Sequence, residues 1–356
     1  MQTRIRPSTT SSSARVRQQR LTTARSTRTA STGATSSRLN RRNVRQSERD
    51  VVEEWYGETP GRTAEVVAAT NGSAATIDRQ FDLVVIDEAT QATIAASASQ
   101  LARANTAVRA GINKHPPPFS KTETPPEEAV GRSLFEHLYA DGGVYEDVGL
   151  QLRTQYRMHR DIAYFPNREF YDRSLRTGLD IDPLEEWDPI LGYDIGGGER
   201  RCGTSFVNPT EASFVARLVD RITAAGVPAA EVGVITPYAA QVHCICDELH
   251  TQSGVPNGEA VTVDTIDAFQ GSERTVILIS LVRSNPDGQT GFLSRPADGP
   301  RRLNVAMTRA ERLCVLVGDW TTLTDDSHDG DIKLYDKLAS FLRDTGRMRE
   351  FDAALL

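Results

Sequence analysis

The sequence contains few cysteines and no long hydrophobic run. Four cysteines among 356 residues are too few and too unevenly spaced for a disulfide framework or a paired-cysteine zinc site. We interpret them as reduced, structural thiols, because the alternative, metal binding by Cys244 and Cys246, lacks a second ligand pair. The longest apolar stretch, around 276–282, is far shorter than the roughly 20 residues of a membrane span, and no apolar signal segment follows Met1. We therefore expect a soluble, cytoplasmic protein without a membrane partner.

Lysine is also scarce, and the positive charge is unevenly distributed. The net charge is −7, but residues 1–50 carry twelve arginines against two acidic residues, a charge of +10, which leaves −17 for the rest. Such an acidic remainder argues against binding nucleic acid by bulk electrostatics, so a strand would need a locally basic groove.

The Arg-, Ser- and Thr-rich segment 1–50 has almost no apolar periodicity, and this composition predicts a disordered arm. Three origins remain open for it. It can be a basic arm that touches phosphates, an organelle transit peptide, or sequence translated out of its original frame.

From residue 64 onward, short apolar runs alternate with helical patterns. A helix is predicted over 211–225, with Asn208 as N-cap, Pro209 in the first turn and Glu211 at the third helical position. Buried strands that alternate with helices predict an α/β fold with parallel sheets covered on both faces. Pro-rich residues 116–126 and Gly- and Asp-rich residues 141–148 are predicted linkers. The runs that we interpret as buried strands are 65–69, 83–86, 232–236, 261–263, 275–282 and 313–317.

An acidic pair follows one of these strands, in the segment FDLVVIDEATQA at 81–92. Ligands of open α/β sheets bind beyond the carboxyl ends of the strands, where Asp87 and Glu88 are expected. There Asp87 can hold Mg²⁺ through water, and Glu88 can orient or deprotonate the water that attacks a γ-phosphate. Gln91 lies one helical turn after Glu88 and can help to hold that water. The plainer alternative is that Asp87 only caps a helix.

This stretch resembles motif II of the superfamily I helicases, and four later segments resemble further motifs of that family in the same order. They are QLRTQYRMH at 151–159, VGVITPYAAQ at 232–241, VDTIDAFQGSE at 263–273 and RRLNVAMTRAE at 301–311. The Gln-Tyr-Arg-Met-His version is most similar to the helicases related to the nonsense-mediated-decay factor and to the nuclease-helicase of Okazaki-fragment processing. The resemblance implies ATP and Mg²⁺ as cofactors and single-stranded nucleic acid as partner.

The resemblance also implies roles for individual residues. Arg157 and Arg309 become candidate arginine fingers, because a phosphoryl-transfer transition state needs cations on its equatorial oxygens. Thr236 and Thr265 end strands, where their hydroxyls and nearby backbone amides can hold phosphates without reading sequence. The remaining implied contacts are Gln155, Tyr156, Gln270, Gly271 and Glu273 for nucleotide, and Pro237 and Tyr238 for nucleic acid.

The sequence departs from the family pattern in two places. No Gly-rich phosphate loop with the spacing G-x-x-x-x-G-K-[ST] occurs, and the nearest approach, at 57–63, has too short a spacing and Arg in place of Lys. In motif III, Ile112 and His115 stand where the family carries Asp and Gln.

We therefore expect RecA-like architecture with an arm at 1–50, a truncated first motor domain at 51–148, a complete second one at 149–325 and a helical tail at 326–356. The expected function is an impaired ATP-dependent DNA or RNA helicase. The alternatives are a non-enzymatic nucleic-acid-binding remnant, or half of a split helicase that a second chain completes with the missing phosphate loop.

Overall fold

The computed structural model describes residues 67, 69–75, 77–111, 133–139, 149–252, 260–269, 271–294, 298–325 and 333–350. They belong to two compact units, which are described separately. Unit 1 comprises Met1–Gly111 and Pro118–Ala140, and unit 2 comprises Ile112–Pro117 and Asp141–Leu356. The predicted arm and both linkers lie outside the described residues, as does most of the predicted strand at 65–69, so these expectations stay predictions.

Unit 1 is built around two parallel strands, β1 (Phe81–Ile86) and β2 (Ala104–Arg109), joined by helix α5 (Ile94–Leu101). The side chain of Thr93 caps this helix by accepting the N–H of Ala96 at 3.2 Å. The sequence predicted parallel sheets that are covered on both faces, but the described strands of unit 1 keep one partly exposed face. Leu83, Val85 and Val108 are 51%, 55% and 49% exposed, and Val85 and Val108 are register partners. Shorter elements of this unit are α4 (Asn71–Ala74), η1 (Ala89–Gln91) and α6 (Leu134–Tyr139).

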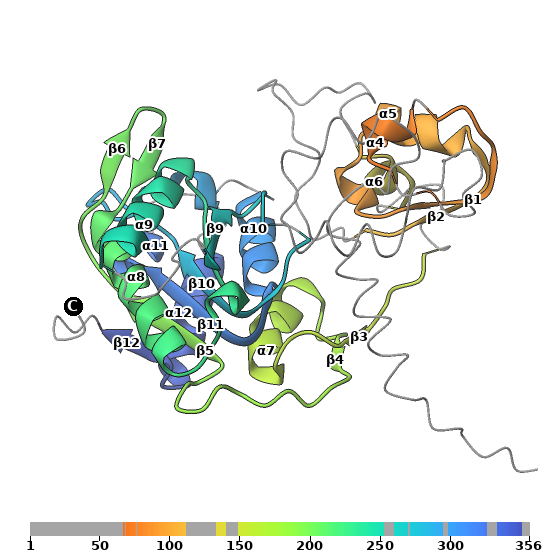
Figure 1. Ribbon diagram of the computed structural model, residues 1–356. Helices are drawn as coiled ribbons and strands as arrows, with labels where there is room; N and C mark the ends of the chain where they lie inside the picture. Colours follow the sequence, from red (N-terminus) through yellow and green to blue (C-terminus); the bar gives the residue numbers. More distant parts are fainter. Residues whose placement is uncertain are drawn as a thin grey trace, which may run out of the picture. The chain divides into compact units, whose positions relative to one another are not determined.

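Unit 2 contains a six-stranded, wholly parallel sheet in the order β12-β5-β11-β10-β8-β9 (Figure 1). The predicted strand at 232–236 is found with the same bounds. The predicted strand at 275–282 ends earlier, because Val282 has a φ of 74°, which no strand residue adopts. The strands are β5 (Ile190–Asp194), β8 (Val232–Thr236), β9 (Thr262–Thr265), β10 (Arg274–Ser280), β11 (Ala310–Gly318) and β12 (Met348–Glu350).

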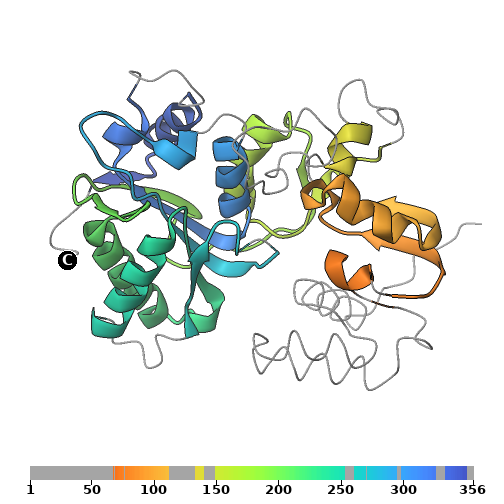
Figure 2. The same ribbon diagram turned by 90° about the horizontal axis from the view of Figure 1, so that it is seen from above.

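Helices cover both faces of this sheet, as the sequence predicted (Figures 1 and 2). Successive residues of β10 alternate between the two cores: Ile277 and Ile279 belong to one, Val276 and Leu278 to the other. The first core is completed by α7 (Arg160–Phe170), α10 (Asp298–Met307), α11 (Trp320–Leu323) and α12 (Lys333–Asp344). The second is completed by α8 (Pro209–Ala224) and α9 (Ala239–Gln252).

Helix α8 starts as predicted. The side chain of Asn208 accepts the N–H of Glu211 at 3.2 Å, and Pro209 occupies the first turn. The Glu211 carboxyl group is fully buried, and one of its oxygens accepts the Ser280 hydroxyl at 2.7 Å and the Val282 N–H at 2.9 Å. The cap of this helix is therefore connected to the carboxyl end of the central strand β10.

The segment 326–356, predicted to be a helical tail, is more than helical. Its helix α12 buries Leu338 and Leu342 in the first core, and its strand β12 pairs with β5. Sequence patterns missed this strand because its three residues, Met348–Glu350, are too few to show a period.

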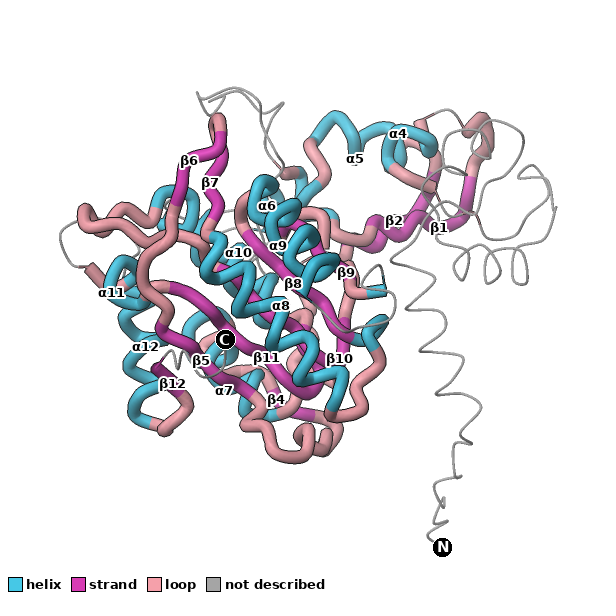
Figure 3. Tube along the Cα trace, turned by 60° about the vertical axis from the view of Figure 1, so that its left-hand side comes forward, coloured by secondary structure: helices cyan, strands magenta, loops and turns pink. Residues whose placement is uncertain are grey.

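Two smaller pairs of strands complete unit 2. The parallel pair is β3 (Thr154–Gln155) and β4 (Arg176–Thr177), and the antiparallel hairpin is β6 (Arg200–Cys202) and β7 (Ser205–Val207). Figure 3 shows this hairpin standing out from the sheet beside α9. Short 3₁₀ turns lie at η4 (Ala229–Glu231) and η6 (Gly291–Ser294). No helix among the described residues has the length and apolar character that crossing a membrane would require.

Strand β8 requires glycine at Gly233. A Cβ there would lie 2.5 Å from Phe269 Cζ and 2.8 Å from Ile277 Cδ1. We expect Gly233→Ala to lower the free energy of unfolding by about 1–3 kcal/mol, the usual cost of overpacking. Urea titration should show a lower midpoint for Gly233→Ala, whereas Gly196→Ala, whose Cβ would meet only Asp319 at 3.9 Å, should match the wild type. Equal midpoints for both variants would refute this reading of the core.

Candidate functional site

The acidic pair of unit 1 follows the carboxyl end of β1, where the sequence placed it. Glu88 adopts a left-handed conformation with φ 49°, and its N–H donates to Asp87 Oδ1 at 3.1 Å. The next residues form the 3₁₀ turn η1, in which the N–H of Gln91 donates to the carbonyl of Glu88 at 2.9 Å. The backbone bond places Gln91 one turn after Glu88, and its predicted role in holding water stays a prediction.

The loop that carries this pair is fixed from two sides. The N–H of Ala89 donates to the carbonyl of Ala110 at 2.8 Å, beyond the end of β2. The Ser133 hydroxyl, which is buried, donates to the carbonyl of Ala89 at 3.1 Å. A buried, hydrogen-bonded support of this kind holds the two carboxylates at a defined place on the sheet edge.

A single carboxylate fits the chemistry expected for Mg²⁺. This ion keeps several waters and is commonly held by one or two carboxylates together with substrate phosphates. Asp87 can supply that contact, and no cluster of three or more His, Cys, Asp or Glu suited to a protein-only metal cage occurs in the described part of the chain.

Three sequence-distant motifs meet in unit 2 at the amino edge of β10 and β11. Arg157 forms an ion pair with Glu273, with Nε 2.5 Å from Oε2, and also donates to the carbonyl of Thr308 at 3.2 Å. Both side chains of the pair are partly exposed, 34% and 50%. The backbone N–H of Arg274 donates to the carbonyl of Arg309 at 3.1 Å, which joins the last two motifs directly.

The two candidate arginine fingers differ in access. Arg309 is buried, 4% exposed, and its Nε donates to the carbonyl of Val305 in the preceding helix at 3.1 Å. Arg157 is the more accessible of the two. Beside them, burial raises the pKa of Glu311, and the carboxylates of Glu273 and Glu231 raise it further. The edge therefore combines permanent cations with carboxylates that interact electrostatically.

Other predicted nucleotide contacts are placed as follows. Tyr156 is 63% exposed. The Gln155 amide is used within its own loop, where Oε1 accepts the N–H groups of Arg157 at 3.0 Å and Met158 at 2.8 Å. Gly271 has a φ of 84°, so the predicted tight turn does need glycine. Gln270 lies outside the described residues.

The predicted nucleic-acid contacts lie at the opposite, carboxyl edge of the same sheet. Thr236 and Thr265 are register partners at the ends of β8 and β9, and the N–H of Ile266 donates to the carbonyl of Thr236 at 3.2 Å. The Thr236 side chain is fully buried, however, and its hydroxyl has no hydrogen-bond partner among the described residues. Tyr238, which follows Pro237, is 9% exposed. Thr265 and Pro237 are partly exposed, and the other accessible groups of this edge come from neighbouring elements.

Sequence reasoning missed one such group, Arg283. The turn at Val282, in which the N–H of Arg283 donates to the carbonyl of Leu281 at 2.9 Å, directs this arginine to Glu199 at 3.1 Å and over the Phe206 ring at 4.2 Å. Burial alone would lower the pKa of Arg283, but Glu199 and the Tyr238 hydroxyl raise it above its ordinary value. The unusual Val-Arg-Ser-Asn end of an apolar strand was the available signal.

A second buried arginine repeats this arrangement. Arg302, on α10, stacks over the Phe292 ring at 4.1 Å and pairs with Asp267 at 3.2 Å. The rings of Phe206, Tyr238 and Phe292 form a chain of contacts with centroid distances of 5.5 and 6.4 Å. The carboxyl edge therefore carries aromatic rings that contact two arginines, Arg283 and Arg302, each paired with a carboxylate.

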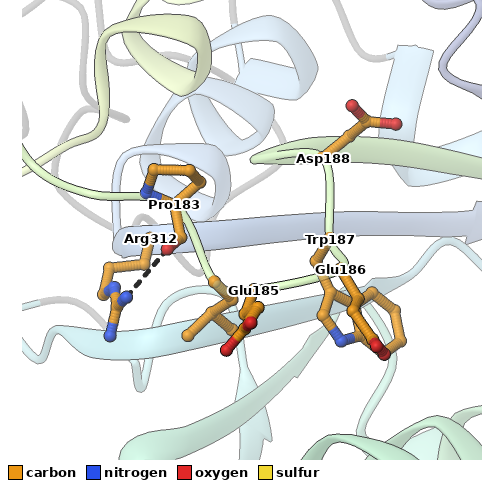
Figure 4. Close-up of a pocket in the computed structure, with 7 residues that line it drawn as sticks. Pro183, Glu185, Glu186, Trp187, Asp188 and Arg312 are labelled. Atoms are coloured by element: carbon orange, nitrogen blue, oxygen red, sulfur yellow. Dashed lines mark hydrogen bonds between the residues drawn. The ribbon is translucent and has the colours of Figure 1, made fainter.

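Two surface hollows of unit 2 lie elsewhere. One, of about 670 Å³, is lined by the loop 183–188 and by Arg312, whose guanidinium donates to the carbonyls of Asp182 and Pro183 at 2.8 Å (Figure 4). The other, of about 650 Å³, lies between α7 and α12. No residue that the sequence predicted for the site lines either hollow.

Comparison with known proteins identifies the family. A family model described as an AAA domain matches residues 130–321. The chain is 36% identical over 255 residues to the 5′-3′ DNA helicase ZGRF1 of Mus musculus, covering 69% of this chain and 13% of that protein. It is 34% identical over 284 residues to the probable helicase MAGATAMA 3 of Arabidopsis thaliana, covering 74% and 34%.

A third relative is the regulator of nonsense transcripts 1 homolog of Neurospora crassa, 34% identical over 295 residues, covering 78% of this chain and 25% of that protein. The matched region thus spans about a third or less of the length of these relatives. The family model, which matches residues 130–321, covers the segments whose residues meet at the two edges of the sheet in unit 2. The chain belongs to the superfamily I helicases, of the type that includes the regulators of nonsense transcripts.

Proposed function

We propose that this chain is an ATP-dependent DNA or RNA helicase by descent whose second motor unit is intact and whose hydrolysis is impaired. The observation that carries this proposal is the meeting of Arg157, Glu273 and Thr308 at one sheet edge, although they lie up to 151 residues apart. Arg157 reaches one of the other two motifs through its ion pair with Glu273 and the other through its hydrogen bond to the Thr308 carbonyl. Their common place supports a nucleotide-facing role for this edge.

The chemistry of the edge suits phosphoryl transfer. Developing charge on the transferred phosphoryl group is stabilised by cations, and the planar Arg157 guanidinium can exchange its partly exposed partner Glu273 for phosphate oxygens. Asp87, in unit 1, would hold Mg²⁺, while Glu88 and Gln91 would orient water. ATP bound there would supply the γ-phosphoryl group, and the protein would contribute positioning and charge.

The chain alone lacks one part of this machinery. Backbone amides and a Lys of a Gly-rich loop normally embrace the β- and γ-phosphates, and no such loop occurs in the sequence. Without it, Glu88 has no firmly held phosphate to act on. ATP binding by this chain should consequently be weak.

The test uses the full purified chain. We expect it to bind labelled single-stranded DNA or RNA at low salt, yet to hydrolyse ATP no faster than its Glu88→Gln variant, with or without the strand. Phosphate release and strand binding would be measured on the same preparations. Strand-stimulated hydrolysis that disappears in Glu88→Gln would reveal a working enzyme, and absence of strand binding would remove the nucleic-acid role.

One observation favours the alternative of a split helicase. Leu83, Val85 and Val108 leave an apolar face on the parallel strands of unit 1 about half exposed, although parallel sheets are normally covered on both faces. A second chain that carries the phosphate loop would cover apolar surface there. Strand-stimulated hydrolysis that appears only on adding the polypeptide encoded immediately upstream would establish completion in trans. A non-enzymatic remnant would bind strands and stay inactive in both assays.

A further inference from the structure

The β6–β7 hairpin of unit 2 lies outside both hydrophobic cores of the large sheet, and no predicted site residue lies on it. Figures 1 and 3 both show it projecting beside α9. In its antiparallel register Arg200 faces Val207, and Arg201 faces Phe206. Directly opposite residues share one face of a hairpin, so Arg201 and Phe206 point to the same side and Arg200 to the other.

The face with Phe206 packs against the carboxyl edge of the sheet, where the predicted nucleic-acid contacts lie. The Phe206 ring contacts Tyr238 edge-on at 5.5 Å, immediately after the end of β8. On the same side, Arg283 covers Phe206 at 4.2 Å and pairs with Glu199, two residues before Arg201. Aromatic and cation–π contacts of this kind stabilise an arrangement beyond the effect of area burial. The hairpin is therefore held in a fixed position over the ends of the strands.

A hydrogen bond secures the hairpin from its other side. The Ser205 hydroxyl accepts the N–H of Ala240 at 3.3 Å, in the first turn of α9. Tyr238 and Ala240 both follow β8 closely. The contacts of Phe206 with Tyr238 and of Ser205 with Ala240 therefore fix the hairpin to the turn that the family resemblance assigns to the nucleic-acid backbone. The hairpin therefore lies directly beside this turn.

Arg201 is the accessible cation of this face. It is exposed and forms no ion pair with a carboxylate among the described residues, whereas Arg283 is buried and neutralised by Glu199. The Nε of Arg201 donates to the carbonyl of Gly203 at 3.0 Å, which orients the guanidinium. A guanidinium carries five N–H donors, so the terminal nitrogens can make a bidentate contact with a phosphate.

We propose that the hairpin is a further nucleic-acid-binding element, in which Arg201 contacts a backbone phosphate of a single strand lying along the carboxyl edge beside Tyr238. This rests on the proposed function, and it adds a contact that the helicase motifs in the sequence do not contain. It also supplies local positive charge where the chain beyond residue 50 carries a net charge of −17. The contact is to phosphate, so it should not depend on base sequence.

The experiment compares Arg201→Ala with Arg200→Ala in the full chain. Both remove one exposed arginine from the same hairpin, on opposite faces, and the twelve arginines of residues 1–50 remain in every variant. Binding of labelled oligo(dT) and of a mixed-sequence strand would be titrated at several salt concentrations. For Arg201→Ala we expect weaker binding of both strands and a plot of log K against log salt that is shallower by about 0.7, the value for one phosphate contact.

The controls separate the possible outcomes. Arg200→Ala should retain the wild-type slope, Arg201→Lys should restore most of it, and all variants should keep the wild-type thermal midpoint. If the wild type binds and Arg201→Ala has the wild-type slope, the hairpin assignment is overturned while the proposed function stands. If the wild type itself does not bind at low salt, both fail. Equal slope losses in the two alanine variants would show a diffuse charge effect and would also overturn the assignment.

Discussion

Replacing Glu211 by Gln is expected to abolish most of the loss of stability that unit 2 undergoes as the pH rises from about 4.5 to about 8. Glu211 is fully buried, and this burial raises the pKa of its carboxyl group from 4.5 to about 8, although the Ser280 hydroxyl and the Val282 N–H favour the charged form. The folded state therefore holds a proton that the unfolded state releases at lower pH. Stability should be full below pH 4.5 and should fall as the pH rises through 8.

The expected slope is about 1.4 kcal/mol per pH unit inside this window, since each unit of pKa shift corresponds to that energy. Urea unfolding of the full chain, followed by tryptophan fluorescence, to which the buried Trp320 contributes, would measure it between pH 5 and 9. Glu211→Gln keeps the side-chain shape but cannot titrate, so its stability should change much less with pH. Glu185→Gln, at an exposed position, should retain the wild-type slope. Parallel pH profiles for wild type and Glu211→Gln would contradict the assignment.

The Glu211 carboxyl group also stabilises the turn at Val282 that orients Arg283 toward Glu199. A positive φ at a β-branched residue such as Val282 costs on the order of 1–3 kcal/mol, and the surrounding structure must compensate for it. The N–H of Val282 donates to Glu211, and the following residue reaches Glu199 and Phe206. A buried group in the helix cap is thereby connected to the arrangement of the carboxyl edge.

Local signals in the sequence were sufficient for much of the fold of unit 2. The strand β8 and the cap of α8 depend on neighbouring residues, namely an apolar run and the pattern Asn208-Pro209 with Glu211 three residues on. Both predictions were confirmed. Strand β5 was missed, because its sequence includes Gly192 and is shaped by partners far along the chain. A Cβ at Gly192 would lie 2.8 Å from Leu342 and 3.0 Å from Met348.

The candidate site shows the same division between local and distant information. Strand ends could be located from apolar runs, so Asp87, Thr236 and Thr265 stand at strand ends as predicted. The direction in which a side chain points could not be predicted from apolar runs. The Thr236 hydroxyl is turned into the core, and Arg283 finds its partner Glu199 84 residues earlier in the chain. Accessibility at an edge is decided by such distant contacts.

Removing residues 326–356 should prevent unit 2 from folding cooperatively. These residues supply α12 and β12. Six side chains of α12 are buried, and β12 forms the edge of the six-stranded sheet beside β5. Burial of each large apolar side chain contributes about 1.5–3 kcal/mol, and the sum for several of them approaches the 5–15 kcal/mol that usually separates folded from unfolded states. A fragment ending at residue 325 would expose the first core, although it retains all five segments that resemble helicase motifs.

Single substitutions within α12 distinguish packing from chain length. Leu338 is fully buried in the first core, so Leu338→Ala should lower the free energy of unfolding by about 2–5 kcal/mol. Its neighbour Lys337 is 55% exposed and pairs with Glu169 at 2.9 Å, so Lys337→Ala should cost at most about 1 kcal/mol. Urea titration of the full-length variants would measure both. A cooperative transition with the wild-type midpoint in the chain ending at residue 325, or equal costs for the two alanine variants, would show that the segment is an appendage. The opposite result would make α12 and β12 part of the motor unit itself.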